Sequence, residues 1–299
     1  MKIFSFPYIV TNEIIRQFEP SGLINLSFCS KRAHAFVKMF AKNRKGDELQ
    51  LSHQYPYGHL LSVSKNVVIR ALSNKPSDFY TSALKTMHGL RWSVDEHRGL
   101  YTYCPDGAMG CRRTANYICD LLNVPVSTVH IHCASDLWML DVAEQRKDQQ
   151  LKNVYVYISD TAKSYSRVMR CNATQYLYCD STPPRIYRFD GKLPPAKKLT
   201  IKTGFWITRE QLLGLESQFV TLSLTRLQSS DINALLRSWL NGGLVNLKYI
   251  KLYGIEIFSD NFDSFRDRLE RVQGRIGYKK SSPLLCTARG RSRWPSGQT

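Results

Sequence analysis

The 299-residue chain contains no apolar run of the roughly 20 residues that a helix needs to cross a bilayer, which excludes a multi-span membrane protein. Its N-terminus has a short apolar stretch that is broken by Pro7 and ended by Thr11 and Asn12, so it predicts no cleavable secretory signal. The eight cysteines are spread along the chain, a distribution that favours free thiols in a reducing compartment. We therefore expect an intracellular protein, in the cytoplasm, the nucleus or both.

Sequence patterns of the common enzyme classes are also missing. The chain has no GxxxxGK[ST], GxGxxG, GxSxG or HExxH motif. His132-Cys133 matches the start of the phosphatase loop His-Cys-x5-Arg, but Met139 stands where that loop requires arginine. The sequence therefore predicts a protein with no catalytic residues and no cofactor-binding residues of its own.

The histidines and cysteines of the chain are its candidate metal ligands. His130, His132 and Cys133 lie together on an expected strand, but zinc takes four ligands, and no CxxC pair or distant histidine pair supplies the others. Six residues separate Cys104 from Cys111 and seven separate Cys171 from Cys179, neither of which is zinc-ribbon spacing. We interpret these side chains as ordinary structural residues and predict no metal site.

Positive charge, by contrast, is abundant. Forty-two Lys and Arg oppose 24 Asp and Glu, giving a formal net charge of +18. Residues 275–299 contribute six basic side chains, no acidic one and no apolar period, so residues 274–299 are predicted to form a basic disordered tail after a helix over 261–272. The rest of the chain is only moderately basic, and its charge does not require a nucleic-acid partner.

Residues 4–42 predict three short helices. Pro7 is suited to a helix start, Val10 and Ile14 recur at helical spacing, and Ser30 is a candidate cap for the third helix. The Glu19-Pro20-Ser21-Gly22 segment interrupts the first pattern. A unit of this size cannot bury all its apolar residues, so we expect a partner to cover some of them.

Strand-like runs and helical segments alternate from about residue 126 onward. The expected strands are 129–131, 154–156, 199–201, 222–224 and 250–252, with a further one near 176–178, and the expected helices are 135–146, 208–215 and 230–240. Thr208 is the expected cap of the second helix, Ser229 or Ser230 that of the third, and Trp239 is expected in the core. Strand and helix recurring every 23–28 residues is typical of a leucine-rich repeat, with parallel strands joined by right-handed crossovers.

Two segments carry a family resemblance. Residues 6–40, FPYIVTNEIIRQFEPSGLINLSFCSKRAHAFVKMF, resemble an F-box, in particular the F-boxes of nematodes. Residues 223–252, SLTRLQSSDINALLRSWLNGGLVNLKYIKL, with LPPAKKLTIKTGFWITREQLL before them, are similar to the type-2 F-box-associated domain of nematodes. The order of the two segments is also the order found in that family.

The sequence patterns and the resemblance together predict an α+β fold in four parts. A small three-helix F-box would occupy residues 1–44, and residues 45–120 would form a connecting region or the start of the repeat domain. Residues 121–273 would form an α/β, degenerate leucine-rich-repeat-like F-box-associated domain, followed by the basic tail, 274–299.

The resemblance also implies a function, that of the substrate-recognition subunit of an SCF-type E3 ubiquitin ligase. The F-box would bind a Skp-type adaptor and, through it, cullin, while the C-terminal domain would bind a target protein that the sequence does not identify. The implied adaptor-binding residues are Pro7, Ile9, Val10, Ile14, Leu23, Ile24, Leu26 and Cys29. Two alternatives stay open, a non-catalytic interaction scaffold and a basic nucleic-acid-binding protein.

Overall fold

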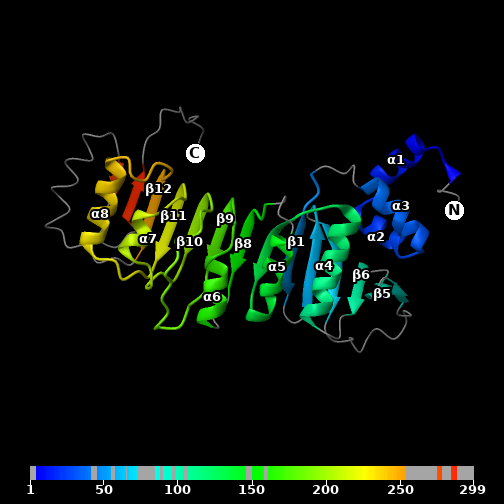
Figure 1. Cartoon of the computed structure of the whole chain (residues 1–299), viewed down its shortest axis with the longest axis horizontal. Helices are drawn as coiled ribbons and strands as arrows, with labels where there is room; N and C mark the ends of the chain where they lie inside the picture. The colour runs from blue at the N-terminus through cyan, green and yellow to red at the C-terminus, as the bar shows by residue number, and fades with distance from the viewer. Residues whose placement is uncertain are drawn as a thin grey trace, which may run out of the picture. The chain divides into compact units, whose positions relative to one another are not determined.

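The computed structural model describes residues 5–41, 46–54, 58–64, 66–72, 85–87, 90–95, 99–103, 107–145, 150–157, 161–253, 275–277 and 284–287. The chain divides into two compact units, Met1–Lys152 and Asn153–Thr299. Each unit combines helices with strands, which confirms the predicted mixed α and β class (Figure 1). Within the described ranges, no helix is both long enough and apolar enough to cross a membrane.

The first unit begins with the three predicted helices, α1 (Tyr8–Gln17), α2 (Pro20–Ser27) and α3 (Lys31–Ala41). Pro7 is the N-cap residue of α1, and Pro20 opens α2, where its missing N–H costs no helical hydrogen bond. The hydroxyl of Ser30 accepts a 3.0 Å hydrogen bond from the backbone N–H of Ala33, as expected for the cap of α3.

A sheet with strand order β7-β1-β2-β3-β6-β5-β4 follows the helices in the same unit. The pairs β1–β2 and β2–β3 are antiparallel, whereas β1 pairs with β7 and β3 with β6 in parallel. The strands are β1 (Leu49–Gln54), β2 (Gly58–Val63), β3 (Asn66–Leu72), β4 (Lys85–Met87), β5 (Leu90–Asp95), β6 (Gly99–Tyr103) and β7 (Val126–Ile131). Gly58 starts β2 at φ +95°, and a Cβ there would lie 2.4 Å from the carbonyl oxygen of Ala71, so this position requires glycine.

The N-terminal helices share a core with the region after them. Helix α4 (Ala108–Leu122) contacts α2, α3, β3 and β5. The ring of Phe28 stacks on both Trp92 and Tyr117, with centroid distances of 4.6 and 5.3 Å. The structure thus differs from the predicted division, because residues 5–41 pack within the first unit and the expected boundary at 120–121 falls inside α4.

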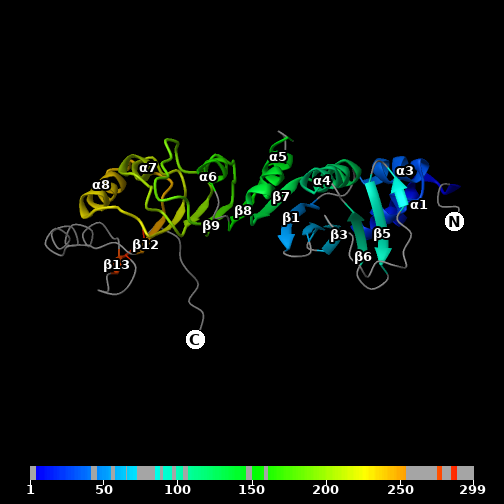
Figure 2. The same ribbon diagram turned by 90° about the horizontal axis from the view of Figure 1, so that it is seen from below.

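The second unit is built on five neighbouring parallel strands, β8 (Asn153–Val156), β9 (Tyr176–Cys179), β10 (Lys198–Ile201), β11 (Phe219–Ser223) and β12 (Tyr249–Tyr253). Helices α6 (Ala162–Met169), α7 (Arg209–Leu213) and α8 (Ser229–Leu240) lie on one side of them (Figure 2). The first residues of successive strands are 23, 22, 21 and 30 positions apart. This confirms the predicted alternation of strands and helices, including the strand near 176–178.

Helix ends in the second unit agree only partly with the sequence analysis. Thr208 caps α7 as predicted, its hydroxyl accepting from the N–H of Gln211 while the Gln211 side chain accepts from the N–H of Thr208. The N-cap residue of α8 is Gln228 rather than Ser229 or Ser230. Trp239 is half-buried and not a core residue, because Ile232, Leu235 and Leu236 occupy the inward face of α8.

The basic tail differs from its prediction in two places. Residues 275–277 form β13 and residues 284–287 form β14, which pairs antiparallel with β12. The pairing has a physical reason, since β12 would otherwise present unpaired backbone N–H and C=O groups at the edge of the sheet. The helix predicted over 261–272 lies outside the described residues.

Candidate functional site

The first candidate surface lies on α1 and the residues before it. We call it the α1 surface and define it by Phe6, Tyr8, Ile9 and Val10, all exposed, with Ile9 reaching 76%. Only one face of α1 is covered, because Ile15 is buried and α1 contacts α3. Four large apolar side chains exposed at one helix start make this region a candidate protein-binding surface.

The eight residues implied as adaptor contacts fall into three groups in the structure. Pro7, Ile9, Val10 and Cys29 are exposed, and Ile14 and Leu26 are half-buried. Leu23 and Ile24 are fully buried, because α2 packs against α3, α4 and β3, so this structure exposes neither side chain to a partner and their contact with the adaptor stays a prediction. Phe6 and Tyr8 were missed, although both flank Pro7 in the same apolar run.

A hollow of about 550 Å³ lies next to this surface, between α1 and α2. Its lining is Ile14, Gln17, Phe18, Glu19, Ser21 and Gly22. A Cβ at Gly22 would lie 3.1 Å from the ring of Phe18, so a larger residue would narrow the hollow. The hollow brings the half-buried Ile14 within reach of a partner side chain.

The second candidate surface is the sheet face of the second unit that points away from the helices. Alternate residues of β8–β12, such as Val154 and Leu177, are buried toward the helices, so their neighbours face the other way. The strand register aligns two rows across this face. They are Asn153-Tyr176-Lys198-Phe219-Tyr249 and Tyr155-Tyr178-Thr200-Thr221-Lys251. We call this surface the tyrosine face.

Rings and ammonium groups contact one another across the tyrosine face. The rings of Tyr155 and Tyr176 meet edge to face at 5.5 Å, and Lys198 Nζ lies 4.7 Å from the centre of the Tyr176 ring. A hydrogen bond of 2.9 Å to Asp180 raises the pKa of Tyr178 to about 12, and burial raises that of Tyr155. These phenols are therefore neutral near pH 7, and the lysines give the face its positive charge.

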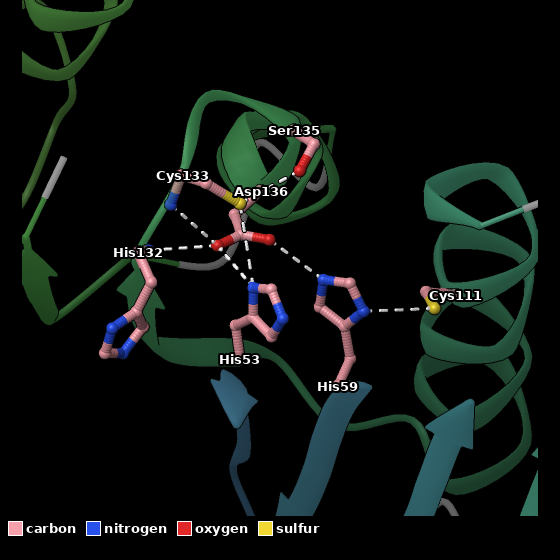
Figure 3. A network of polar contacts seen from close by, with 7 residues as sticks. All are labelled: His53, His59, Cys111, His132, Cys133, Ser135 and Asp136. Carbon is pink, nitrogen blue, oxygen red and sulfur yellow. Dashed lines mark hydrogen bonds and ion pairs between the residues drawn. The ribbon is translucent and has the colours of Figure 1, made fainter. Parts of the chain in front are cut away.

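A third set of polar side chains surrounds Asp136, which lies on the short 3-10 helix η2 (Ala134–Leu137) just after β7 (Figure 3). The Asp136 carboxylate is fully buried and accepts hydrogen bonds from the backbone N–H groups of His132 and Cys133, at 2.9 and 3.1 Å. His53 Nδ1 and His59 Nε2 lie 3.1 and 2.9 Å from its two oxygens. Burial acts to raise the pKa of Asp136, but these hydrogen bonds outweigh burial and hold it well below the ordinary value.

Two thiols adjoin the same histidines. Cys111 Sγ lies 3.3 Å from His59 Nδ1, which gives a Cys-His-Asp order with Asp136, but Cys111 is only 1% exposed. Cys133 Sγ lies 3.6 Å from His53 Nδ1 and 2.9 Å from the Ser135 hydroxyl, and burial raises the pKa of its thiol. Nucleophilic catalysis needs an accessible thiolate of low pKa, and neither thiol meets that requirement.

The sequence pointed to only part of this set. His132 and Cys133 were considered together with His130, but His130 Nε2 instead contacts the side-chain amide nitrogen of Gln50, at 2.9 Å. His53 and His59 were missed because strand pairing brings them together, as opposed residues of the β1–β2 hairpin. The available signal was a histidine on each side of the sequence Pro-Tyr-Gly, which is typical of a turn.

Comparison with known proteins bears on the second unit. Residues 193–252, which run from just before β10 into β12, match the family described as F-box associated. The Skn-1 dependent zygotic transcript 15 protein of Caenorhabditis elegans is 21% identical over 277 residues, covering 84% of this chain and 78% of that protein. No solved structure matches the chain. The matches confirm the resemblance to nematode proteins with an F-box associated domain, a family that implies a general role in substrate recognition.

Proposed function

We propose that the chain is the substrate-recognition subunit of an SCF-type E3 ubiquitin ligase that acts inside the cell. Its N-terminal helices would serve as the F-box and bind a Skp-type adaptor, which links to cullin. The second unit would hold the target protein. The observation that carries this proposal is the exposed apolar α1 surface in a chain whose residues 193–252 match the F-box associated family.

The α1 surface suits a partner that offers an apolar groove. Its side chains lie at the start of a helix that begins at Tyr8, on successive residues that point about 100° apart, so they expose apolar surface on more than one side of that helix end. Each Å² of apolar surface removed from water contributes about 25 cal/mol, so a partner that covers these side chains gains stabilisation from their burial. A helix that lays its apolar side into a groove is a recurring mode of recognition.

The tyrosine face suits an extended, acidic segment of a target protein. Tyrosines offer a large contact area and lose little conformational entropy when they are held in place. Lys198 and Lys251 add positive charge to the two rows, which favours acidic partners and speeds their approach. In this role the chain breaks and forms no covalent bond. It raises the concentration of target lysines near the ubiquitin-carrying enzyme.

Co-purification with a Skp-type adaptor tests the first half of the proposal. Ile9→Asp in the full chain should strongly reduce adaptor capture, because a carboxylate in an apolar groove loses its hydration without gaining a partner. Ile186→Asp is a matched control, since Ile186 is 90% exposed and lies in the second unit. Both variants should unfold at the temperature of the native chain.

Normal capture of the adaptor by Ile9→Asp, or equal loss in both variants, would contradict the assignment of the α1 surface. Reconstitution with cullin and a ubiquitin-carrying enzyme then separates a ligase subunit from a scaffold, because only the former supports ubiquitin transfer. Retention on nucleic acid that weakens steeply with salt would instead favour the nucleic-acid alternative.

A further inference from the structure

The side chains around Asp136 have the composition and the spacing of a zinc site. Imidazole nitrogen, thiolate sulfur and carboxylate oxygen are the three ligand types that zinc takes from proteins. One ligand atom each from His53, Cys133 and Asp136 lies within 4.8 Å of the other two. Tetrahedral zinc with bonds of about 2.0–2.3 Å holds its ligand atoms about 3.3–3.5 Å apart. The observed separations from His53 Nδ1, 3.1 Å to Asp136 Oδ2 and 3.6 Å to Cys133 Sγ, are close to these values.

We propose that His53, Cys133 and Asp136 bind one zinc ion through Nδ1, Sγ and a carboxylate oxygen, with water in the fourth position. This inference goes beyond ubiquitin-ligase function and does not depend on it. His53 and Cys133 are both partly exposed, so zinc and water can reach these two side chains from solvent, whereas Asp136 contributes its carboxylate from the buried side.

The surroundings of the three ligands support their orientation. The backbone N–H groups of His132 and Cys133 and the ring of His59 hold the Asp136 carboxylate in place, and such contacts orient metal ligands in known sites. On binding, Cys133 loses its thiol proton to solvent, and His53 takes the neutral tautomer with its proton on Nε2, so that Nδ1 has a lone pair for the ion. The ion takes the place of the hydrogen bond between His53 and Asp136.

Zinc at this position would join two parts of the first unit that are far apart in sequence. His53 lies on β1, whereas Cys133 and Asp136 follow β7, its parallel neighbour. The ion would fix the β1–β2 hairpin to the turn that leads into α5 (Trp138–Glu144), with its fourth position held by water.

Metal titration of the full chain tests the proposal. After treatment with a chelator and removal of that chelator, the native chain should take up one equivalent of zinc. Cobalt in place of zinc should give the visible bands of tetrahedral Co²⁺ together with a thiolate-to-cobalt charge-transfer band in the near ultraviolet. Cys133→Ser should lose the charge-transfer band and bind zinc more weakly, whereas Cys29→Ser, which changes an exposed thiol on another element, should behave as the native chain does.

A variant outside the ligand set makes the test sharper. His59→Gln removes a contact of Asp136 but no ligand, so it should keep the charge-transfer band while weakening zinc affinity roughly 10–100-fold. The proposal fails if the native chain takes up no stoichiometric zinc, or if the charge-transfer band survives in Cys133→Ser. If a variant does not fold, the absence of zinc uptake by the native chain would still overturn the proposal.

Discussion

At the residue scale, two tryptophans that look alike in the sequence have different surroundings. Trp206 is 5% exposed, three aromatic rings meet its edges within 6 Å, and its Nε1–H donates a 3.0 Å hydrogen bond to the carbonyl of Thr203. Trp239, near the end of α8, is only half-buried. The first belongs to the core, and the second has part of its ring in water.

Truncation of each tryptophan should therefore have unequal effects. Trp206→Ala should lower the free energy of unfolding by about 3–5 kcal/mol, since it leaves a cavity among aromatic rings. Trp239→Ala should cost clearly less, because solvent already reaches its side chain. Urea titration followed by circular dichroism measures both, and equal losses would contradict the difference in burial.

Tyr117 predicts a change of stability with alkaline pH. Burial raises its pKa from 10.0 to about 12, against a smaller opposite effect of its 2.7 Å hydrogen bond with Ser27. The unfolded chain therefore loses this proton first as pH rises, so the stabilisation is complete below pH 10.0 and is lost as pH approaches about 12. Tyr117→Phe should be less stable at pH 8 and should show a shallower alkaline decline. Urea titrations at several pH values between 8 and 12 measure this decline. If the free energy of unfolding falls equally steeply with pH in Tyr117→Phe and in the native chain, this account is contradicted.

Residue roles could be predicted from the sequence where they depend on near neighbours. Thr208 as a cap needs only Gln211 three residues later, and both are visible in the sequence. Asp136 is different, because two of its four partners, His53 and His59, reach it through the pairing of β1 with β2 and β7. No local pattern encodes that register.

At the element scale, the strands of the second unit were the most predictable part. Aliphatic residues occupy every second position in β8 and β12, and this alternation can be read from the local sequence without knowledge of the neighbouring strands. Helix α4 was missed, since it starts after Gly107, contains Gly110 and buries small residues such as Cys111 and Ala115. The inward face of α4 is buried, but several of its residues are small or polar, so the sequence shows no strong helical pattern of large apolar residues.

The tyrosine face gives a prediction at this scale. Lys198→Glu combined with Lys251→Glu should leave the fold unchanged, because Lys198 is exposed and Lys251 partly exposed. From a displayed library of random peptides, the native chain should select acidic sequences, and the double variant should lose that preference. Lys163→Glu combined with Lys192→Glu, two exposed lysines away from the face, provides the control. If the Lys198→Glu, Lys251→Glu variant still selects acidic peptides, these two lysines do not contribute to target binding.

At the scale of the whole molecule, the C-terminal strands bear on the stability of the second unit. Truncation after Gln273 removes β14 and leaves β12 as an edge strand. Backbone amides of Tyr249–Tyr253 should then exchange hydrogen for deuterium faster, and the unit should unfold at a lower temperature. Truncation after Thr287 retains both strands and should change neither measurement. If truncation after Gln273 leaves the hydrogen exchange of these amides unchanged, the tail is dispensable, as the sequence predicts.

Inward and outward residues alternate in β8–β12, and this separates the positions that form the core from the positions that can change in sequence among related proteins. Leu177 and Leu252 determine whether the second unit folds, whereas their neighbours Tyr178 and Lys251 face outward on the tyrosine face. After gene duplication, selection can therefore act on the outward positions alone. A family built in this way can acquire new binding preferences by single substitutions while its framework stays constant, and outward positions should vary most among related copies.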